Sequence, residues 1–178
     1  MRSRTARATD VMAVHRLIAH YADEGTLLPR AEDEIRKHIS HFLVLVEKRN
    51  DDEDEKLLGC VALEPYGPDL SEIRSLAVSP DARGHGYNVG DRLMKAAMDT
   101  ARRRKIARLF AVTHRPEFFS RYGFTPGPRQ MVPEKIERDC LTCPKKHHCA
   151  LVATVAVVCP ERDVLPVLNG AWKIVPVL

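Results

Sequence analysis

The residues most able to do chemistry lie close together around Glu72 and Arg74. These two alternate with Ile73, Ser75 and Ala77, so a β-strand would place the carboxylate and the guanidinium on one face and the other three on the opposite face. A carboxylate can take a proton from a reacting group, and a guanidinium can hold an anionic one. The pair therefore indicates acid–base chemistry on an anionic small molecule or a simple ion pair on a strand.

A glycine-rich loop follows this strand. Pro80 ends the strand, and Gly84, Gly86 and Gly90 mark the passage into a helix. Glycines let a loop turn its backbone N–H groups inward, and the start of a helix carries a partial positive charge. Such a strand, loop and helix predict a phosphate site. The helix has an apolar residue at every fourth position, namely Val89, Leu93, Ala97 and Ala101.

The elements that must position these residues alternate along the chain. Thr9 and Asp10 offer a helix start before a helical apolar pattern. The acidic run 51–55 indicates a solvated hairpin turn, and the basic run 102–105 closes the helix after the glycine loop. The further expected elements are strands over residues 3–8, 41–47, 57–64, 107–113 and 151–158, helices over 32–40 and 116–122, and an irregular or helical segment over 131–138.

Composition indicates one globular domain. The chain has 178 residues, of which 44% are hydrophobic, so we expect a single domain over residues 1–178 that includes a C-terminal tail, 160–178. A net charge of +4, with acidic residues interspersed, does not argue for nucleic acid and suits a small anionic partner equally well. The longest apolar run, 150–159, is too short to cross a bilayer, so we expect a cytoplasmic protein without a membrane partner. The apolar tail can complete the chain's own core or pair in a homodimer.

Three of the five cysteines fall in one loop, residues 139–149. Cys140, Cys143 and Cys149 have a spacing that structural zinc can use. A single Cys-x-x-Cys pair is also compatible with redox-sensitive thiols or with an ordinary exposed loop. We expect no obligatory metal.

The order of the strands, helices and glycine loop resembles the GNAT superfamily of acetyl-coenzyme A-dependent N-acetyltransferases. The superfamily pattern Arg/Gln-x-x-Gly-x-Gly/Ala is met as Arg83-Gly-His-Gly86-Tyr-Asn88. Alternatively, Tyr87-Asn88 is an insertion and Val89-Gly90 takes the usual place; we favour this alignment because it keeps the helical stripe in register. The resemblance implies an α/β (α+β) fold in which a mixed sheet of about six or seven strands is flanked by helices. The glycine loop then joins the fourth strand to the following helix.

A closer resemblance covers residues 9–150 and is to N-acetylglutamate synthases of the short bacterial kind. The stretch 112–124 is the most telling, because Thr-x-Arg followed by an aromatic pair and Gly-Phe is typical of that family. The four stretches that carry the resemblance are Leu28-Pro29-Arg30, Glu72-Ile-Arg-Ser-Leu-Ala-Val78, Val112-Thr-His-Arg-Pro-Glu-Phe-Phe-Ser-Arg-Tyr-Gly-Phe124 and Asp139-Cys-Leu-Thr-Cys-Pro144.

The resemblance implies acetyl-coenzyme A as co-substrate. The pantetheine arm is expected along the backbone of residues 76–78 and the pyrophosphate in the loop 83–90, while a backbone N–H near Val78 polarises the thioester carbonyl. Many relatives carry a tyrosine before Gly-Phe that protonates the departing sulfur. Here Phe119 stands at that place, and Tyr122 is not assigned the role. The expected cofactor-binding residues are Leu76, Ala77, Val78, Arg83, Gly84, His85, Gly86, Val89, Gly90 and Phe119.

For the acceptor, the resemblance implies that Arg115 holds a carboxylate of glutamate. Arg74, Arg30 and Thr113 are further candidates, although Arg30 could equally be a surface loop residue. Glu72 stands where many superfamily members place the base that takes the amine proton. An ion pair with Arg74 would make this carboxylate a weaker base and would count against that role.

The expected function is transfer of acetyl from acetyl-coenzyme A to the α-amine of L-glutamate, which the resemblance makes the first step of arginine biosynthesis. Two alternatives stay open. The fold and the cofactor loop do not fix the acceptor, so it could be another small amine or amino acid. The altered loop could also belong to a non-catalytic coenzyme A-binding protein or to a thiol or metal sensor.

Overall fold

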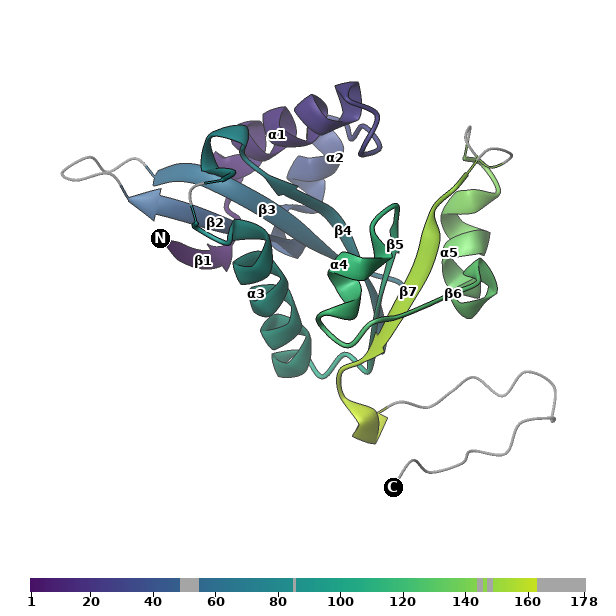
Figure 1. The fold of residues 1–178 in the computed structure, drawn as a ribbon. Coiled ribbons are helices and arrows are strands. Elements are labelled where there is room, and N and C mark those ends of the chain that lie inside the picture. Colours follow the sequence, from purple (N-terminus) through teal and green to yellow (C-terminus); the bar gives the residue numbers. More distant parts are fainter. Residues whose placement is uncertain (49–54, 85, 144–145, 147–148, 163–178) are drawn as a thin grey trace, which may run out of the picture.

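A seven-stranded sheet of order β1-β2-β3-β4-β5-β7-β6 forms the centre of the protein (Figure 1). The structure is a computed structural model that describes residues 1–48, 55–84, 86–143, 146 and 149–162. All strand pairs are antiparallel except β4 with β5, which is parallel. The strands are β1 (Arg2–Thr5), β2 (Phe42–Lys48), β3 (Glu55–Pro65), β4 (Leu70–Val78), β5 (Arg108–Thr113), β6 (Thr125–Gly127) and β7 (Val152–Val157).

Helices connect the strands, and in the part of the chain that the structure describes none is long and apolar enough to cross a membrane. The expected second helix ends early, because the chain passes into a separate short turn before β2. The helices are α1 (Val11–Asp23), α2 (Glu32–Lys37), α3 (Val89–Arg103), α4 (Pro116–Ser120) and α5 (Pro133–Lys135), which continues as a π-helical turn η5 (Ile136–Cys140). Short 3-10 turns are η1 (Ala8–Asp10), η2 (Ile39–His41), η3 (Pro80–Ala82), η4 (Arg129–Met131) and η6 (Pro160–Arg162).

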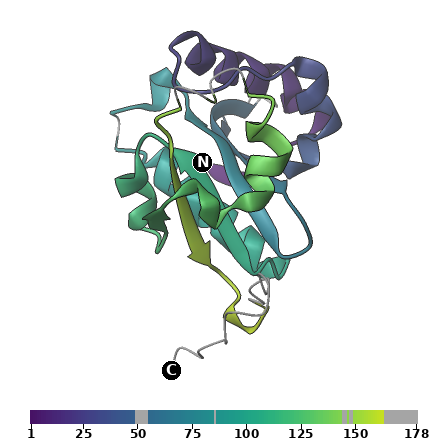
Figure 2. The ribbon, with the colours of Figure 1, turned by 90° about the vertical axis from the view of Figure 1, so that its right-hand side faces the viewer.

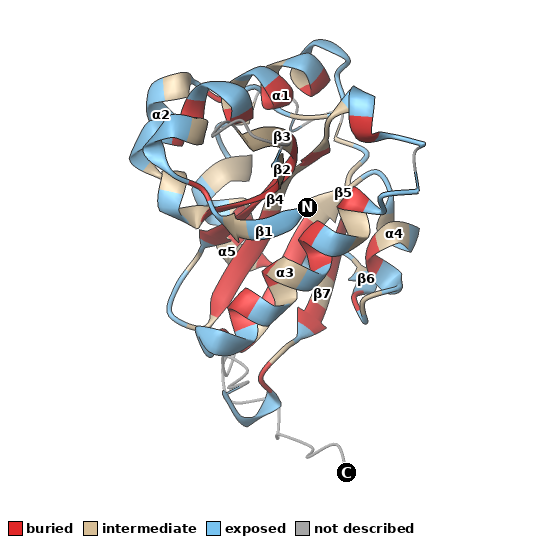
Figure 3. Ribbon diagram, turned by 90° about the vertical axis from the view of Figure 1, so that its left-hand side faces the viewer, coloured by how far each residue is buried: buried red, intermediate tan, exposed pale blue. Residues whose placement is uncertain are grey.

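The helices cover both faces of the sheet (Figure 3). Along β2 the side chains alternate, so that Val44 packs with α1 and α2 while Leu43 packs with α3. Further along the chain, Phe110 of β5 packs with Val132, just before α5, on the face opposite α3. Figure 2 shows α5 beside the β5–β7 part of the sheet. The predicted mixed sheet flanked by helices is therefore confirmed.

Helix α3 lies directly on β3. Its predicted apolar stripe is confirmed, since all four residues, Val89, Leu93, Ala97 and Ala101, are buried. The close approach depends on Gly59, because a Cβ there would lie 2.6 Å from the Ala77 carbonyl oxygen and 2.9 Å from Leu93 and Val89. This packing fixes the start of α3, and with it the end of the glycine loop, beside the end of β4.

Strand β4 contains an irregularity that the sequence pattern did not reveal. Its pairing with β3 shifts register between Ala77 and Arg74, and Ser75 has a φ of +50°. Ile73 consequently packs on the α3 face, whereas Ala77 packs on the α1 face. The prediction that Ile73, Ser75 and Ala77 share one face is wrong, because a bulge reverses the alternation.

Three predicted features fall outside the described residues. They are most of the acidic turn 51–55, residue His85 of the glycine loop and nearly all of the tail 160–178.

Candidate active site

The two central strands separate at the middle of the sheet. The parallel pairs of β4 and β5 run from Leu70–Arg108 to Glu72–Phe110, although β4 continues to Val78 and β5 to Thr113. Beyond Glu72, the β5-facing edge of β4 thus has backbone groups that the ladder with β5 does not use. An extended ligand could pair with them as an added strand does.

The backbone of Val78 illustrates this free edge. The N–H of Ser79 donates to the Leu58 carbonyl of β3 at 2.8 Å, so the N–H of Val78, one residue earlier, points to the opposite edge. The carbonyl of Val78 accepts a hydrogen bond of 2.6 Å from the hydroxyl of Tyr21 in α1. The predicted polarising N–H near Val78 therefore faces the side where β4 and β5 separate.

The glycine loop ends at the start of α3. Gly84 and Gly86 have positive φ angles, as does Asn88, which is the last residue before the helix. No side chain caps this helix start, and its first backbone bond runs from the Arg92 N–H to the Asn88 carbonyl. The N–H groups at the helix start therefore lack intrahelical partners and can serve an anion. Which of the two loop alignments applies, and which groups meet the pyrophosphate, stay predictions.

Arg83 and Phe119, both of the predicted cofactor set, contact aromatic rings. The guanidinium of Arg83 stacks 4.8 Å from the centre of the Tyr21 ring, which ties the loop to α1. Phe119 is only 6% exposed and packs edge-on against Phe118 and Phe124. Phe118 is the ring beside the helix start, 3.7 Å from the position that a Cβ on Gly90 would take.

The hydroxyl of Tyr122 is already engaged. It donates to the carboxylate of Asp91 in the first turn of α3. Burial and this hydrogen bond raise the pKa of Tyr122 above its usual value. Whether Tyr122 takes part in protonating the departing sulfur is not tested by these contacts, and its exclusion from that role stays a prediction.

Glu72 and Arg74 meet, as predicted, on one face of β4. Arg74 Nε lies 3.4 Å from Glu72 Oε2, and the Glu72 side chain is only 5% exposed. Two further groups contact the same oxygen: the oxygen of the Tyr66 hydroxyl lies 2.9 Å from it, and Lys135 Nζ donates to it at 2.9 Å. The ion pair that would weaken Glu72 as a base is therefore present, and its role as base stays a prediction.

Asp139 in η5 completes this group of charged residues, which we call the Glu72 network (Tyr66, Glu72, Arg74, Lys135 and Asp139). Asp139 Oδ2 lies 2.6 Å from Lys135 Nζ, 2.5 Å from the Tyr66 hydroxyl and 3.4 Å from Arg74 NH1. Burial would raise the pKa of Asp139, but the hydrogen bonds from Lys135 and Tyr66 outweigh it and lower that pKa. Burial and the nearby carboxylates raise the pKa of Tyr66.

Arg30 lies in a second polar group, beside the first. Its side chain is 4% exposed and bonds Glu34 at 2.6 Å, with Glu64 Oε2 3.7 Å away. Glu64 also accepts a 3.0 Å hydrogen bond from Arg138 and lies 3.6 Å from His41 Nδ1. The interpretation of Arg30 as a surface loop residue is therefore wrong, because burial and two carboxylates hold it inside.

Arg115 and Thr113 lie where β5 ends. The Arg115 side chain is 83% exposed, with Nε 3.6 Å from Glu117, and the Arg115 N–H donates to the Thr113 hydroxyl at 3.0 Å. The contacts described for Arg115 do not include Glu72 or Arg74. Thr113 thus stabilises the turn, and the substrate roles of both residues stay predictions.

The three cysteines of the loop 139–149 have free, partly buried thiols in the structure. Burial raises the pKa of Cys140, and the neighbouring Cys143 and Cys149 add to that rise. The described cluster whose ligand atoms could hold a metal is a different one, His38, His41 and Glu64. There, however, Arg30 and Arg138 already contact the carboxylate, and their positive charges oppose a cation.

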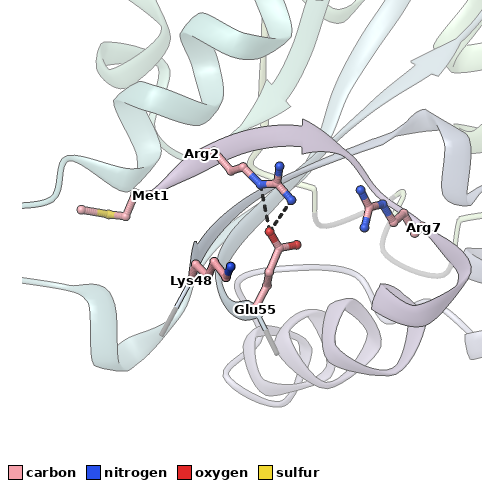
Figure 4. Close-up of a pocket in the computed structure, with 5 residues that line it drawn as sticks. All are labelled: Met1, Arg2, Arg7, Lys48 and Glu55. Carbon is pink, nitrogen blue, oxygen red and sulfur yellow. Dashed lines mark hydrogen bonds and ion pairs between the residues drawn. The ribbon is translucent and has the colours of Figure 1, made fainter. Parts of the chain in front are cut away.

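A depression of about 580 Å³ lies at the far edge of the sheet, beside β1 (Figure 4). Arg2 lines it and donates two hydrogen bonds to Glu55, at 2.8 and 2.6 Å. The other lining residues are Met1, Arg7 and Lys48. None of the predicted site residues lines this depression, so the candidate site is the place where β4 and β5 separate.

Sequence reasoning missed four contributors to the site: Tyr21, Tyr66, Lys135 and Asp139. Tyr66 lies in the turn that joins β3 to β4, whereas the other three come from elements more than forty residues from β4 in the chain. A weak signal existed for Lys135 and Asp139, which are four residues apart and would share a helix face. The tyrosines had no such signal.

Comparison with known proteins gives a consistent result. The sequence matches the family described as "Acetyltransferase (GNAT) family" over residues 11–124. It is 35% identical over 152 residues to an uncharacterized N-acetyltransferase of Chlorobaculum tepidum, covering 85% of this chain and 93% of that protein. It is 36% identical over 124 residues to an amino-acid acetyltransferase of Mycobacterium tuberculosis, covering 68% of this chain and 67% of that one.

A solved structure is similar as well. The N-acetylglutamate synthase from Neisseria gonorrhoeae, complexed with coenzyme A and N-acetyl-glutamate, superposes with a TM-score of 0.73 and 31% identity over 88% of this chain. The chain spans only 35% of the length of that synthase.

Proposed function

Because the chain belongs to the GNAT family of acetyltransferases, we propose that it transfers acetyl from acetyl-coenzyme A to the α-amine of an amino acid, with L-glutamate as the acceptor. One observation carries the proposal: β4 and β5 separate beyond Glu72, and the charged side chains of Glu72 and Arg74 stand where they do so. An acyl donor lying along β4 would then meet an amine held by charged groups. By the likeness to the synthases, this reaction would begin arginine biosynthesis.

The donor side can be derived from the backbone. The pantetheine arm pairs with the free edge of β4, and the pyrophosphate meets the N–H groups at the start of α3. Coenzyme A is bound in the similar gonococcal synthase, which supports coenzyme A as the donor's carrier. The N–H of Val78 faces the same side and is suited to stabilise the negative charge that develops on the thioester oxygen.

The acceptor nitrogen loses two protons as its ammonium becomes an amide: one before the attack, and one after it, which the departing thiolate or the solvent takes up. The amine nitrogen attacks the thioester carbonyl carbon, the C–S bond breaks, and coenzyme A departs as a thiolate. The acceptor's ammonium must first lose a proton, and Glu72 is the carboxylate placed to receive it, directly or through water. Tyr122 is not needed to protonate the departing sulfur, because a thiolate is a good leaving group near neutral pH.

The acceptor's carboxylates require cationic partners. Arg115 offers an exposed guanidinium at the end of β5, and Arg74 stands beside Glu72. We expect Arg115→Ala to raise the KM for glutamate about tenfold, since a charge-assisted hydrogen bond contributes about 1.5–3 kcal/mol. The KM for acetyl-coenzyme A should change little. Arg102→Ala, which removes an exposed arginine elsewhere on α3, is the matched control. Equal changes in both KM values, or no change, would contradict the assignment of glutamate.

A second acceptor class deserves the same assay. Arg30 is bonded to Glu34 and faces Glu64, and Arg74 is shared between Glu72 and Asp139. Two of the three candidate guanidiniums are therefore already neutralised within the protein. This favours, as the alternative, an amino acid with a single carboxylate as acceptor.

A further inference from the structure

Lys135 lies beside Glu72 and has no role in the reaction proposed above. Its ammonium group donates to three oxygen atoms: Asp139 Oδ2 at 2.6 Å, Glu72 Oε2 at 2.9 Å and the Tyr66 hydroxyl at 3.1 Å. The side chain is only 11% exposed. An ammonium has three donors, so all of them are used here. Lys135 is therefore held in one place and holds Glu72 in turn.

The contacts of Glu72 are all on one of its two oxygen atoms. Lys135, Tyr66 and Arg74 each approach Oε2. No described contact involves Oε1, and Oε1 is not among the buried side-chain atoms that lack a partner. Oε2 thus anchors the carboxylate, while Oε1 remains available to a ligand or a water molecule.

Lys135 is also the nearest cation to Glu72. Arg74 is the other cation, but it stands 3.4 Å away and is equally distant from Asp139. The negative groups nearby are Asp139, from η5, and Glu64, which pairs with Glu72 in the β3–β4 ladder. Tyr66 contributes a neutral hydroxyl. Arg138 lies 3.0 Å from Glu64 and 3.5 Å from Asp139, and Arg30 lies 3.7 Å from Glu64. Without Lys135, these two carboxylates would keep arginine partners, whereas Arg74 would be the one described cation in contact with Glu72.

We propose that Lys135 is a positioning residue for the acetyl transfer, which anchors Oε2 of Glu72 so that Oε1 is held ready to accept the proton of the acceptor amine. The inference rests on the proposed function for its catalytic consequence. The contact between Lys135 and Glu72 does not depend on it. The ammonium group that holds the Glu72 carboxylate thus lies on α5, outside the strand and loop proposed to bind the cofactor.

The first test is the pH dependence of kcat/KM for the acceptor in Lys135→Met and Lys135→Gln. Removing the ammonium favours protonated Glu72, so the acidic limb should move up by about one pH unit. Asp139→Asn removes a negative charge instead, so its acidic limb should move down. Lys135→Arg should restore most of the wild-type profile, and Lys95→Met, which removes an exposed lysine of α3, should leave it unchanged.

The second test needs no turnover. In protein labelled with 13C at the glutamate side-chain carboxyl carbons, the Glu72 resonance is identified as the one lost in Glu72→Gln. It should titrate at higher pH in Lys135→Gln than in the wild type, by about the same one unit. Lys135→Gln retains hydrogen-bonding capacity, so it provides the comparison even if the methionine variant does not fold.

The outcomes distinguish the proposed role of Lys135 from the proposed acetyltransferase function. An unchanged Glu72 titration in Lys135→Gln would overturn the inference, whatever the enzyme's activity. A rise in kcat/KM in either variant would also overturn it, because Lys135 would then block the site rather than prepare it. A wild-type protein that acetylates no amino acid, but whose Glu72 titration shifts as stated, would refute the proposed function and leave the coupling intact.

Discussion

The two ends of β4 are built on different principles. Toward Val78, the strand has backbone groups that the ladder with β5 does not use, and it is followed by the glycine loop and by a helix start that no side chain caps. Toward Glu72, the strand carries charged side chains that contact residues of α5 and η5. We call these the proposed donor end and the proposed acceptor end of β4. The difference teaches that the proposed donor site depends on backbone geometry, whereas the proposed acceptor site depends on side chains brought together by the fold.

The largest effect is expected from a substitution at Gly59, the residue on which the start of α3 packs beside the Val78 end of β4. In Gly59→Val, the new side chain would collide with the Ala77 carbonyl, Leu93 and Val89. We expect a loss of about 3 kcal/mol or more in the free energy of unfolding, because the rigid backbone of β4 cannot yield. Binding of acetyl-coenzyme A should be lost along with the docking of α3. Denaturant unfolding and calorimetric titration measure the two quantities.

Gly90→Ala is the matched control for that change. A Cβ at Gly90 would meet Phe118 at 3.7 Å, an ordinary contact, and Gly90 already lies within the first turn of α3. If only the backbone N–H of this residue serves the cofactor, the variant should bind acetyl-coenzyme A as the wild type does. A large loss of affinity in this variant would show that the donor end depends on more than backbone geometry.

The next largest effect is expected at the other end, in Glu72→Gln. The amide cannot take a proton from the acceptor, so kcat should fall about 100-fold, the lower range for loss of a general base. The Kd for acetyl-coenzyme A should stay the same, because no cofactor contact is removed. Rapid-quench kinetics and calorimetry measure these values. An equal weakening of cofactor binding would mean that the two ends of β4 are not separable.

The smallest effect is expected in Tyr122→Phe, a residue that contacts the first turn of α3. Its hydroxyl bonds Asp91, so its loss should lower the free energy of unfolding by about 1–2 kcal/mol. The turnover number should remain within about twofold, because burial and Asp91 raise the pKa of this hydroxyl and make it a reluctant acid. A tenfold drop in kcat with unchanged stability would instead assign Tyr122 to the chemistry.

The donor end could be predicted from the sequence because it is contiguous. Proline, glycines and an apolar stripe follow one another, and each has a local conformational meaning. The bulge at Ser75 could not be predicted. It arises because two residues of β4 lie opposite one residue of β3, and Ser75 is not a glycine whose positive φ a sequence would suggest. It reverses the strand's alternation and so sends Ala77 to the opposite face from Ile73.

The acceptor end could be predicted only in part. Glu72 and Arg74 were identified because they share a strand face, but their partners come from segments more than sixty residues away, as with Lys135 and Asp139. Arg30 lies in an unremarkable loop sequence and is buried because Glu34 and Glu64 neutralise it. Such pairings depend on tertiary packing, for which a single sequence has no local signal.

The most direct test of the central claim is release of free thiol from acetyl-coenzyme A by the purified chain, measured with a panel of single amino acids. The account predicts that L-glutamate gives the highest kcat/KM and that N-acetylglutamate forms in equal amount with coenzyme A. Binding of acetyl-coenzyme A without thiol release for any amino acid would contradict it.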